Sequence, residues 1–184
     1  NIPVEKQFTD YHDLINNPDI NVISVAIPDQ QHKQVCCELL AAGKILIVAE
    51  GKAAIAYTEK AYGYLPYREV AVSEGAIEDA AYYAFELEAA EGGWYIKDNT
   101  GKYLYQAGTY NSFNMSEEVP SDGGVWTIAI ADDGTATITN TTVNKYIQYS
   151  TGYSSYGSYA ELQSGAVLPV IYIPYVEPEP EPEP

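Results

Sequence analysis

Residues 94–105 read WYIKDNTGKYLY, and residues 136–148 read ATITNTTVNKYIQ. Each stretch holds a strand-like run, an Asn-Thr turn, and then a lysine, a tyrosine and an aliphatic residue. Both continue into a segment rich in Tyr and Ser, residues 108–113 in the first and 151–156 in the second. The two copies lie about 42 residues apart, and self-similarity at a fixed period is typical of a fold built from repeated units.

A weaker third copy lies upstream, where residues 44–55 read KILIVAEGKAAI. It has the strand, the turn, the lysine and a second strand. All three copies would end in an apolar strand, at residues 85–88, 126–130 and 170–173. Three units of about 40 residues with four short strands each predict a mainly β fold, a β-trefoil-like barrel. A duplicated β-sandwich without a true third copy is the alternative, and both remain open.

The barrel hypothesis makes two geometric predictions. Residues 44–49, 94–98 and 136–140 should occupy equivalent positions about a pseudo-threefold axis. Leu46 or Ile47 should then meet Ile96 and Ile138 in a shared layer. In the strand at residues 126–130, alternation predicts that Trp126, Ile128 and Ile130 point inward, whereas Thr127 and Ala129 point outward.

The first 43 residues follow a different pattern. A continuous apolar run at residues 22–27 predicts a buried parallel strand, residues 30–42 predict a helix, and residues 45–48 return as a strand. We therefore expect three parts: a partial Rossmann-like α/β fragment (1–43), an all-β repeat domain (44–176) and a solvated Glu-Pro tail (177–184).

Residues 8–15, 17–28, His32 and 39–44 resemble the second part of the nucleotide-binding domain of the Gfo/Idh/MocA oxidoreductases. The resemblance implies NAD binding, but no G-x-G-x-x-G phosphate loop occurs in the 184 residues. Where the family carries Glu-Lys-Pro, this chain has Glu50-Gly51-Lys52. His32 and Lys52 are the residues that an oxidoreductase could recruit, with solvated surface roles as the alternative. We therefore expect no cofactor.

Residues 44–176 carry a second resemblance, through Tyr62–Pro66, Tyr103–Asn114, Val125–Ile128 and Lys145–Ser150. These segments look like a repeat-containing C-terminal module of secreted or surface proteins from Bacteroides-type gut bacteria. The resemblance implies an extracellular or cell-surface accessory domain. It carries no catalytic residues over to this chain.

The charge balance excludes some classes of partner. Nine Lys and Arg stand against 26 Asp and Glu, for a formal net charge of −17. Such a surface repels nucleic acids and anionic membranes, and no apolar run approaches the roughly 20 residues of a membrane span. We therefore expect no nucleic-acid partner and no membrane span.

The predicted β domain contains neither histidine nor cysteine. The histidines, His12 and His32, and the cysteines, Cys36 and Cys37, all precede it. This excludes Ser–His–Asp and Cys–His nucleophiles and the usual zinc sites from it, so we expect no catalytic or metal-binding residue. Asp122, Asp132 and Asp133 lie in apparent hairpin turns beside glycines, where aspartate is favoured for backbone reasons; the alternative is a glycosidase-type acid pair.

Tyrosines near amides and hydroxyls form the candidate binding surface. Tyrosine rings can stack on a sugar while neighbouring polar groups bind its hydroxyls. The alternative is that these tyrosines only cover the barrel ends. The candidate ligand-binding residues are Tyr110, Asn111, Tyr153, Tyr156 and Tyr159.

Three functional hypotheses follow from these observations. The first is a noncatalytic extracellular binding module whose partner is a glycan or another protein domain. The second is a fragment of a Gfo/Idh/MocA-like NAD-dependent oxidoreductase. The third is a structural spacer, which the Glu-Pro tail suggests.

Overall fold

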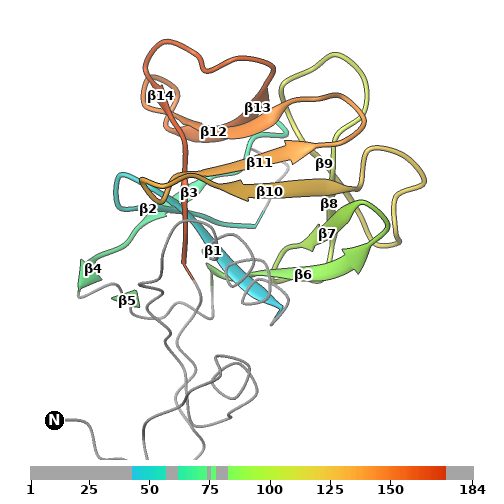
Figure 1. Cartoon of the computed structure of the whole chain (residues 1–184), viewed down its shortest axis with the longest axis horizontal. Coiled ribbons are helices and arrows are strands. Elements are labelled where there is room, and N and C mark those ends of the chain that lie inside the picture. The colour runs from blue at the N-terminus through green and yellow to red at the C-terminus, as the bar shows by residue number, and fades with distance from the viewer. Residues whose placement is uncertain (1–42, 57–61, 74–75, 78–82, 173–184) are drawn as a thin grey trace, which may run out of the picture.

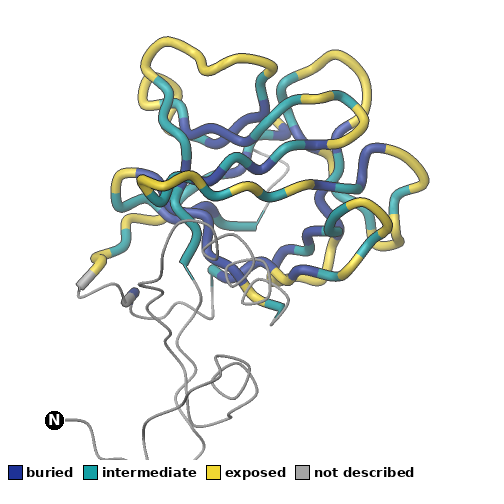
Figure 2. Tube along the Cα trace, in the orientation of Figure 1, coloured by how far each residue is buried: buried dark blue, intermediate teal, exposed yellow. Residues whose placement is uncertain are grey.

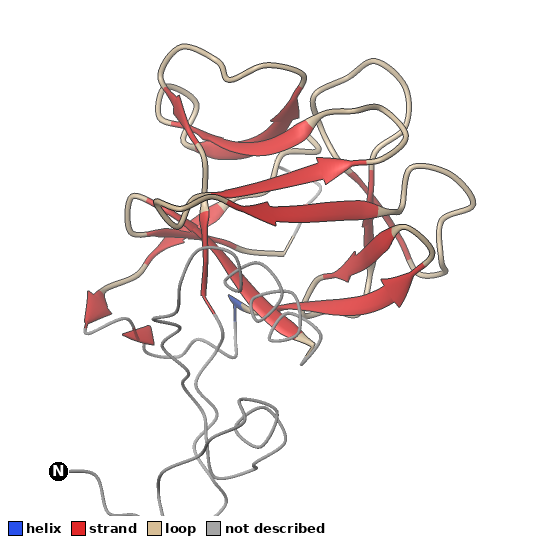
Figure 3. Cartoon of the chain, viewed as in Figure 1, coloured by secondary structure: helices blue, strands red, loops and turns tan. Residues whose placement is uncertain are grey.

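The computed structural model describes residues 43–56, 62–73, 76–77 and 83–172. The predicted Rossmann-like fragment and the Glu-Pro tail, with His12 and His32, lie outside these residues. Within them the chain forms short strands joined by turns (Figures 1 and 3). The strands are β1 (Lys44–Ala49), β2 (Lys52–Ala54), β3 (Tyr67–Glu69), β4 (Val72–Ser73), β5 (Ala76–Ile77), β6 (Phe85–Ala90), β7 (Gly93–Lys97), β8 (Tyr103–Tyr105), β9 (Asn114–Ser116), β10 (Trp126–Ile130), β11 (Ala136–Asn140), β12 (Tyr146–Ser150), β13 (Ser155–Tyr159), β14 (Ala166–Val167) and β15 (Val170–Tyr172).

Six of these strands close into a ring. β1 pairs with β6, β6 with β7, β7 with β10, β10 with β11, and β15 with β1, all antiparallel. A bridge between Thr135 and Val170, with a 2.7 Å hydrogen bond from the Ala136 amide to the Pro169 carbonyl, joins β11 to β15. A ring of six antiparallel strands has no open edge, which is the defining property of a barrel.

Three hairpins branch from this ring, one in each unit. They are β2–β3, β8–β9 and β12–β13, and each lies between the first and fourth strands of its unit. The predicted β-trefoil-like fold is therefore confirmed, and the sandwich alternative is wrong. The first strands begin at residues 44, 93 and 136, so the second and third units have the predicted spacing and the first unit is longer.

The predicted layer at the barrel centre is also present. Ile47, Ile96 and Ile138 are fully buried in one cluster. Each is the cross-strand partner of an aliphatic residue on the adjacent fourth strand of a unit, namely Ile171, Leu87 and Ile128 respectively. Ile47 is the member from β1, because Leu46 points into a separate, smaller cluster of buried residues. Figure 2 shows the buried residues along the barrel strands.

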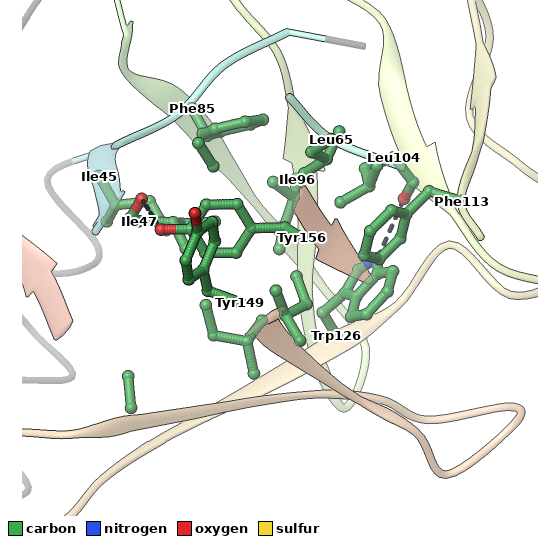
Figure 4. Close-up of a cluster of buried hydrophobic side chains, with 14 of the residues drawn as sticks. Ile45, Ile47, Leu65, Phe85, Ile96, Leu104, Phe113, Trp126, Tyr149 and Tyr156 are labelled. Carbon is green, nitrogen blue, oxygen red and sulfur yellow. Dashed lines mark hydrogen bonds between the residues drawn. The ribbon is translucent and has the colours of Figure 1, made fainter. Parts of the chain in front are cut away.

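The first unit has small residues where the others have large ones. Ala53 and Ala54 of β2 stand where β8 has Tyr103 and Leu104. The rings of Tyr149 and Tyr156, from the third unit, pack in the same cluster as Ala54, with centroids 5.1 Å apart (Figure 4). These two rings contribute volume on the side of Ala54, whereas Ala53 packs in the smaller cluster with Leu46 and Val48.

Both the side chain and the backbone carbonyl of Lys52 contact other residues of the barrel. Its Nζ lies 5.6 Å from the centroid of the Tyr149 ring and donates a 3.4 Å hydrogen bond to the Glu50 carbonyl. The Lys52 carbonyl accepts a hydrogen bond from the Tyr156 hydroxyl. Gly51 before it adopts a φ of 70°, which closes the tight turn from β1 to β2 and which glycine adopts without steric cost.

The predicted register of β10 is confirmed. Trp126 is fully buried, and Ile128 and Ile130 pack against the core. Thr127 and Ala129 are exposed. The Trp126 indole Nε1 donates a 2.9 Å hydrogen bond to the Leu104 carbonyl, so its one polar group is satisfied inside the core.

Candidate binding surface

Each unit contains one segment between its second and third strands with the same pattern of burial. A tyrosine is exposed, and the residue three positions later is buried. Tyr62, Tyr110 and Tyr153 are 90%, 77% and 83% exposed. The buried residues are Leu65, Phe113 and Tyr156, and all three belong to the main core cluster. The core therefore anchors each exposed tyrosine through a short stretch of backbone.

Backbone hydrogen bonds join these segments to one another across the three units. The Phe113 amide donates to the Gly63 carbonyl over 2.6 Å, and the Ser158 amide donates to the Asn111 carbonyl over 2.9 Å. Leu65 and Tyr156 form a bridge with bonds of 3.1 and 2.9 Å. Each unit is thus bonded to both others. Residues 62–65, 110–113 and 153–159 are here named the hairpin face.

A tyrosine cluster lies where the first and third units meet on the hairpin face. Gly157 carries no side chain beneath the rings of Tyr64 and Tyr159. A Cβ built on Gly157 would lie 2.8 Å from Tyr159 Cε2 and 3.0 Å from Tyr64 Cε1. Burial raises the pKa of the Tyr159 hydroxyl above its ordinary value, and the nearby Tyr64 and Tyr153 raise it further. Tyr64 and Tyr159 are therefore neighbours over Gly157, and Tyr153, four residues before Gly157, is 83% exposed.

Lys145 fixes the segment of the second unit. Its Nζ donates to the carbonyls of Thr109 and Tyr110 over 2.7 and 2.8 Å, and to Asn111 Oδ1 over 3.1 Å. Gln106, which is fully buried, donates from Nε2 to the Tyr110 carbonyl over 2.9 Å. These bonds hold the backbone that carries Tyr110 and Asn111, so both are presented on a fixed support.

The structure brings together four of the five residues predicted for ligand binding. Tyr159 packs with Tyr64 over Gly157, Asn111 is hydrogen bonded to Ser158 of β13, and Tyr153 is exposed just before β13. Tyr110 is exposed on the adjoining segment. Tyr156 is a correction: it is fully buried in the core cluster (Figure 4), and its ring cannot meet a ligand. Its hydroxyl bonds to the Lys52 carbonyl.

Sequence reasoning missed two tyrosines of the hairpin face, Tyr62 and Tyr64. The signal was available in the run Tyr62-Gly63-Tyr64-Leu65. It has an aromatic residue three positions before a core residue, as in Tyr110–Phe113 and Tyr153–Tyr156. The first unit departs from the repeat at Ala53-Ala54, which replace the tyrosine and large aliphatic residue of the other units, and this hides the correspondence further along.

Two of the turn aspartates, Asp133 and Asp122, accept hydrogen bonds from threonines. Asp133 Oδ1 accepts hydrogen bonds from the Thr135 amide and hydroxyl over 3.0 and 2.6 Å, and these bonds lower the pKa of the carboxyl. Asp122 Oδ1 accepts from the Thr142 hydroxyl over 3.1 Å. In the part of the chain that the structure describes, no three His, Cys, Asp or Glu residues gather as a metal site would require. The same described residues include no helix long and apolar enough to span a bilayer.

Comparison with known proteins gives a match at the N-terminus. Residues 1–50 match the model of an oxidoreductase family with an NAD-binding Rossmann fold. The matched stretch ends inside the barrel, because residues 44–49 form β1. No curated protein sequence matches the chain.

Solved structures resemble the chain in fold. SeviL, solved bound to asialo-GM1 saccharide, is 17% identical with a TM-score of 0.51, over 72% of this chain and 98% of that one. Cytolethal distending toxin from Actinobacillus actinomycetemcomitans is 10% identical with a TM-score of 0.55, over 76% and 96%. A GlcNAcα1-4Gal-releasing endo-β-galactosidase from Clostridium perfringens is 16% identical with a TM-score of 0.51; 70% of this chain covers 32% of the enzyme. At these identities the likeness is one of fold.

Proposed function

We propose that the described domain is a noncatalytic binding module for neutral carbohydrate, and that it works outside the cell or on the cell surface. The observation that carries the proposal is the pair of rings of Tyr64 and Tyr159 above Gly157, with exposed Tyr153 on the same segment and Asn111 hydrogen bonded to Ser158. Half-exposed rings on a fixed support offer apolar faces to the C–H side of a sugar ring. The neighbouring amide and phenol groups can bind the sugar hydroxyls.

The charge of the chain favours a neutral ligand. At a formal net charge of −17, a sulfated or sialylated glycan would be repelled over distances of about a Debye length, roughly 8–10 Å. A neutral oligosaccharide has no such penalty. SeviL, which shares the fold, binds an asialo saccharide in its solved structure, and this supports testing glycans without sialic acid first.

The extracellular location rests on the resemblance of residues 44–176 to accessory modules of secreted and surface proteins. A spacer role is the outcome to be expected if no ligand binds.

The second candidate function, an NAD-dependent oxidoreductase fragment, is favoured by the family match over residues 1–50. β1 lies within that match and is paired with β2, β6 and β15 in the barrel.

Binding to an array of neutral oligosaccharides, followed by calorimetry, tests the proposal. Tyr153→Ala should weaken binding of the neutral oligosaccharide that binds best in the array at least about fivefold, because removing one stacking ring costs roughly 1 kcal/mol. Gly157→Ala should weaken it as well, since the new methyl group must displace the rings of Tyr64 and Tyr159.

The matched control is Tyr95→Ala, which removes a half-exposed tyrosine on β7, away from the hairpin face. It should leave the affinity within about twofold of the unaltered protein. Equal losses in Tyr95→Ala and Tyr153→Ala would contradict this site, and the absence of binding across the array would contradict the function.

A further inference from the structure

Tyr64 and Tyr159 come from different units and meet over a residue that has no side chain. The bridge between Leu65 and Tyr156, with backbone hydrogen bonds of 3.1 and 2.9 Å, sets the segment of the first unit antiparallel to β13. Tyr64 is therefore opposite Gly157, and Tyr159 lies two residues further along β13 on the same side of that strand. Aromatic side chains in such a diagonal arrangement are within reach of each other.

The two rings turn toward each other the carbon atoms at which tyrosines can be joined. A Cβ built on Gly157 would lie 2.8 Å from Tyr159 Cε2 and 3.0 Å from Tyr64 Cε1, so these two carbons are no more than about 5.8 Å apart. Each of them is ortho to its phenol oxygen. When a phenol loses an electron and a proton, the unpaired electron that remains is shared with the ortho carbons, and two such carbons can bond directly.

Both rings are open to a reagent in solution, because Tyr64 and Tyr159 are half-exposed. Three other tyrosine pairs with rings in contact each contain at least one buried ring: Tyr95–Tyr103, Tyr67–Tyr149 and Tyr149–Tyr156. Residues 44–176 also contain no cysteine, so a disulfide cannot join the units of the barrel. The Tyr64–Tyr159 pair is thus placed to serve as a covalent link of another kind.

We propose that Tyr64 and Tyr159 form an oxidative cross-linking site, at which a Cε–Cε bond joins the first unit to the third. This inference goes beyond the proposed function and does not depend on it. Each phenol gives up one electron and its hydroxyl proton. The two ring carbons then bond, and their hydrogens move to the phenol oxygens. The oxidant is hydrogen peroxide acting through a haem peroxidase: one molecule takes up the two electrons and two protons and becomes two molecules of water.

The bond would close a loop that runs from residue 64 to residue 159. A covalent link across a long loop restricts the unfolded chain more than the folded one, as a disulfide does, and so favours the fold. The cross-linked protein should therefore melt at least about 5 °C above the untreated protein.

Peroxidase treatment of the full 184-residue chain tests the inference. Dilute protein is treated with a haem peroxidase and hydrogen peroxide, and the monomer is isolated by size-exclusion chromatography. Dityrosine fluorescence reports the new bond, and mass spectrometry of tryptic peptides locates it. The bond should join peptides 61–68 and 146–184, with the loss of two hydrogen atoms.

Tyr64→Phe and Tyr159→Phe should each lower the yield of the joined peptides at least about tenfold, because phenylalanine has no phenol and proximity decides which rings couple. The matched control is Tyr62→Phe with Tyr153→Phe. It removes two more exposed phenols from the same two peptides, since these tyrosines are 90% and 83% exposed. It should leave the yield within about twofold of the unaltered protein.

Joined peptides that persist in Tyr64→Phe or Tyr159→Phe, or that vanish in the control, would overturn the assignment. An oxidised monomer in which these two peptides are not joined would overturn it as well. A cross-linked monomer that melts no higher than the untreated protein would overturn the stabilising role of the link.

Discussion

Tyr153 and Tyr156 lie three residues apart in one loop and strand, yet they meet opposite environments. Tyr153 is exposed, whereas Tyr156 is buried and its hydroxyl bonds to a main-chain carbonyl of the first unit. Burial raises the pKa of Tyr156 far above its ordinary value, so its hydroxyl stays a donor at any physiological pH. Tyrosine therefore occurs both as a buried core residue and as an exposed surface residue within four positions of the chain.

The outer surface of the barrel gives a prediction at the residue scale. Glu88 on β6 forms a 2.7 Å ion pair with Lys97 and accepts a 3.0 Å hydrogen bond from the Tyr103 hydroxyl. The hydrogen bond from Lys97, then that from Tyr103, lowers the pKa of Glu88. A carboxyl with a lowered folded pKa stabilises the fold above its unfolded pKa, and that contribution is lost as pH falls through the folded value.

Glu88→Gln should therefore lower the melting temperature at pH 7 and have no such effect at a pH below the folded pKa of Glu88. Glu86→Gln is the matched control, since it removes the same charge from the same strand at a longer distance of 3.9 Å from Lys97. Thermal unfolding by circular dichroism at both pH values measures the effect. A loss in Glu88→Gln that is the same at low and neutral pH would contradict the assignment.

At the scale of the elements, β10 places the bulkiest buried side chain in the core. Trp126 is fully buried, hydrogen bonded to Leu104, and 6.0 Å from the Phe113 ring by centroids. Trp126→Ala should cost roughly 3–5 kcal/mol of unfolding free energy, through lost burial, a cavity and an unpaired carbonyl. Denaturant unfolding measures the loss.

The matched control is Trp94→Ala on β7, because Trp94 is the cross-strand partner of Trp126 and is only half-buried. It should cost less, about 1–3 kcal/mol, in proportion to the smaller area that it buries. If both substitutions cost the same, the inward register of β10 would not account for the stability of the strand.

The strands of the second and third units could be predicted from the sequence because their turns are strong local signals. Asn-Thr-Gly before Lys102 and the alternation at Trp126 fix both the turn and the face. The burial of Tyr156 could not be predicted, because its ring packs in one cluster with Ala54 and its hydroxyl bonds to the Lys52 carbonyl, about 100 residues away. Tyr62 and Tyr64 were missed because Ala53-Ala54 hide the correspondence of the first unit to the other two.

At the scale of the whole molecule, residues 44–49 belong both to the barrel, as strand β1, and to the family match over residues 1–50. β1 is hydrogen bonded along the barrel to β6 and β15, and at its end to β2. A Rossmann sheet needs the same backbone groups for its own parallel neighbours.

We therefore expect no measurable binding of NAD or NADP by the 184-residue chain, even at millimolar ligand. The chain has no G-x-G-x-x-G loop to hold a pyrophosphate, and the barrel already uses β1. Calorimetry with each dinucleotide measures this. Saturable binding at micromolar concentration would contradict it.

The double hydrogen bonding of β1 has an energetic consequence. Two folds that require the same strand are coupled with negative sign, because the free energy gained when one forms must cover the loss of the other. Pulling β1 out would break its pairing to β6 and β15 and expose Ile45 and Ile47, both fully buried. Any ligand that favoured a dinucleotide fold over residues 1–50 would thereby destabilise the barrel, and any ligand bound to the barrel would oppose it.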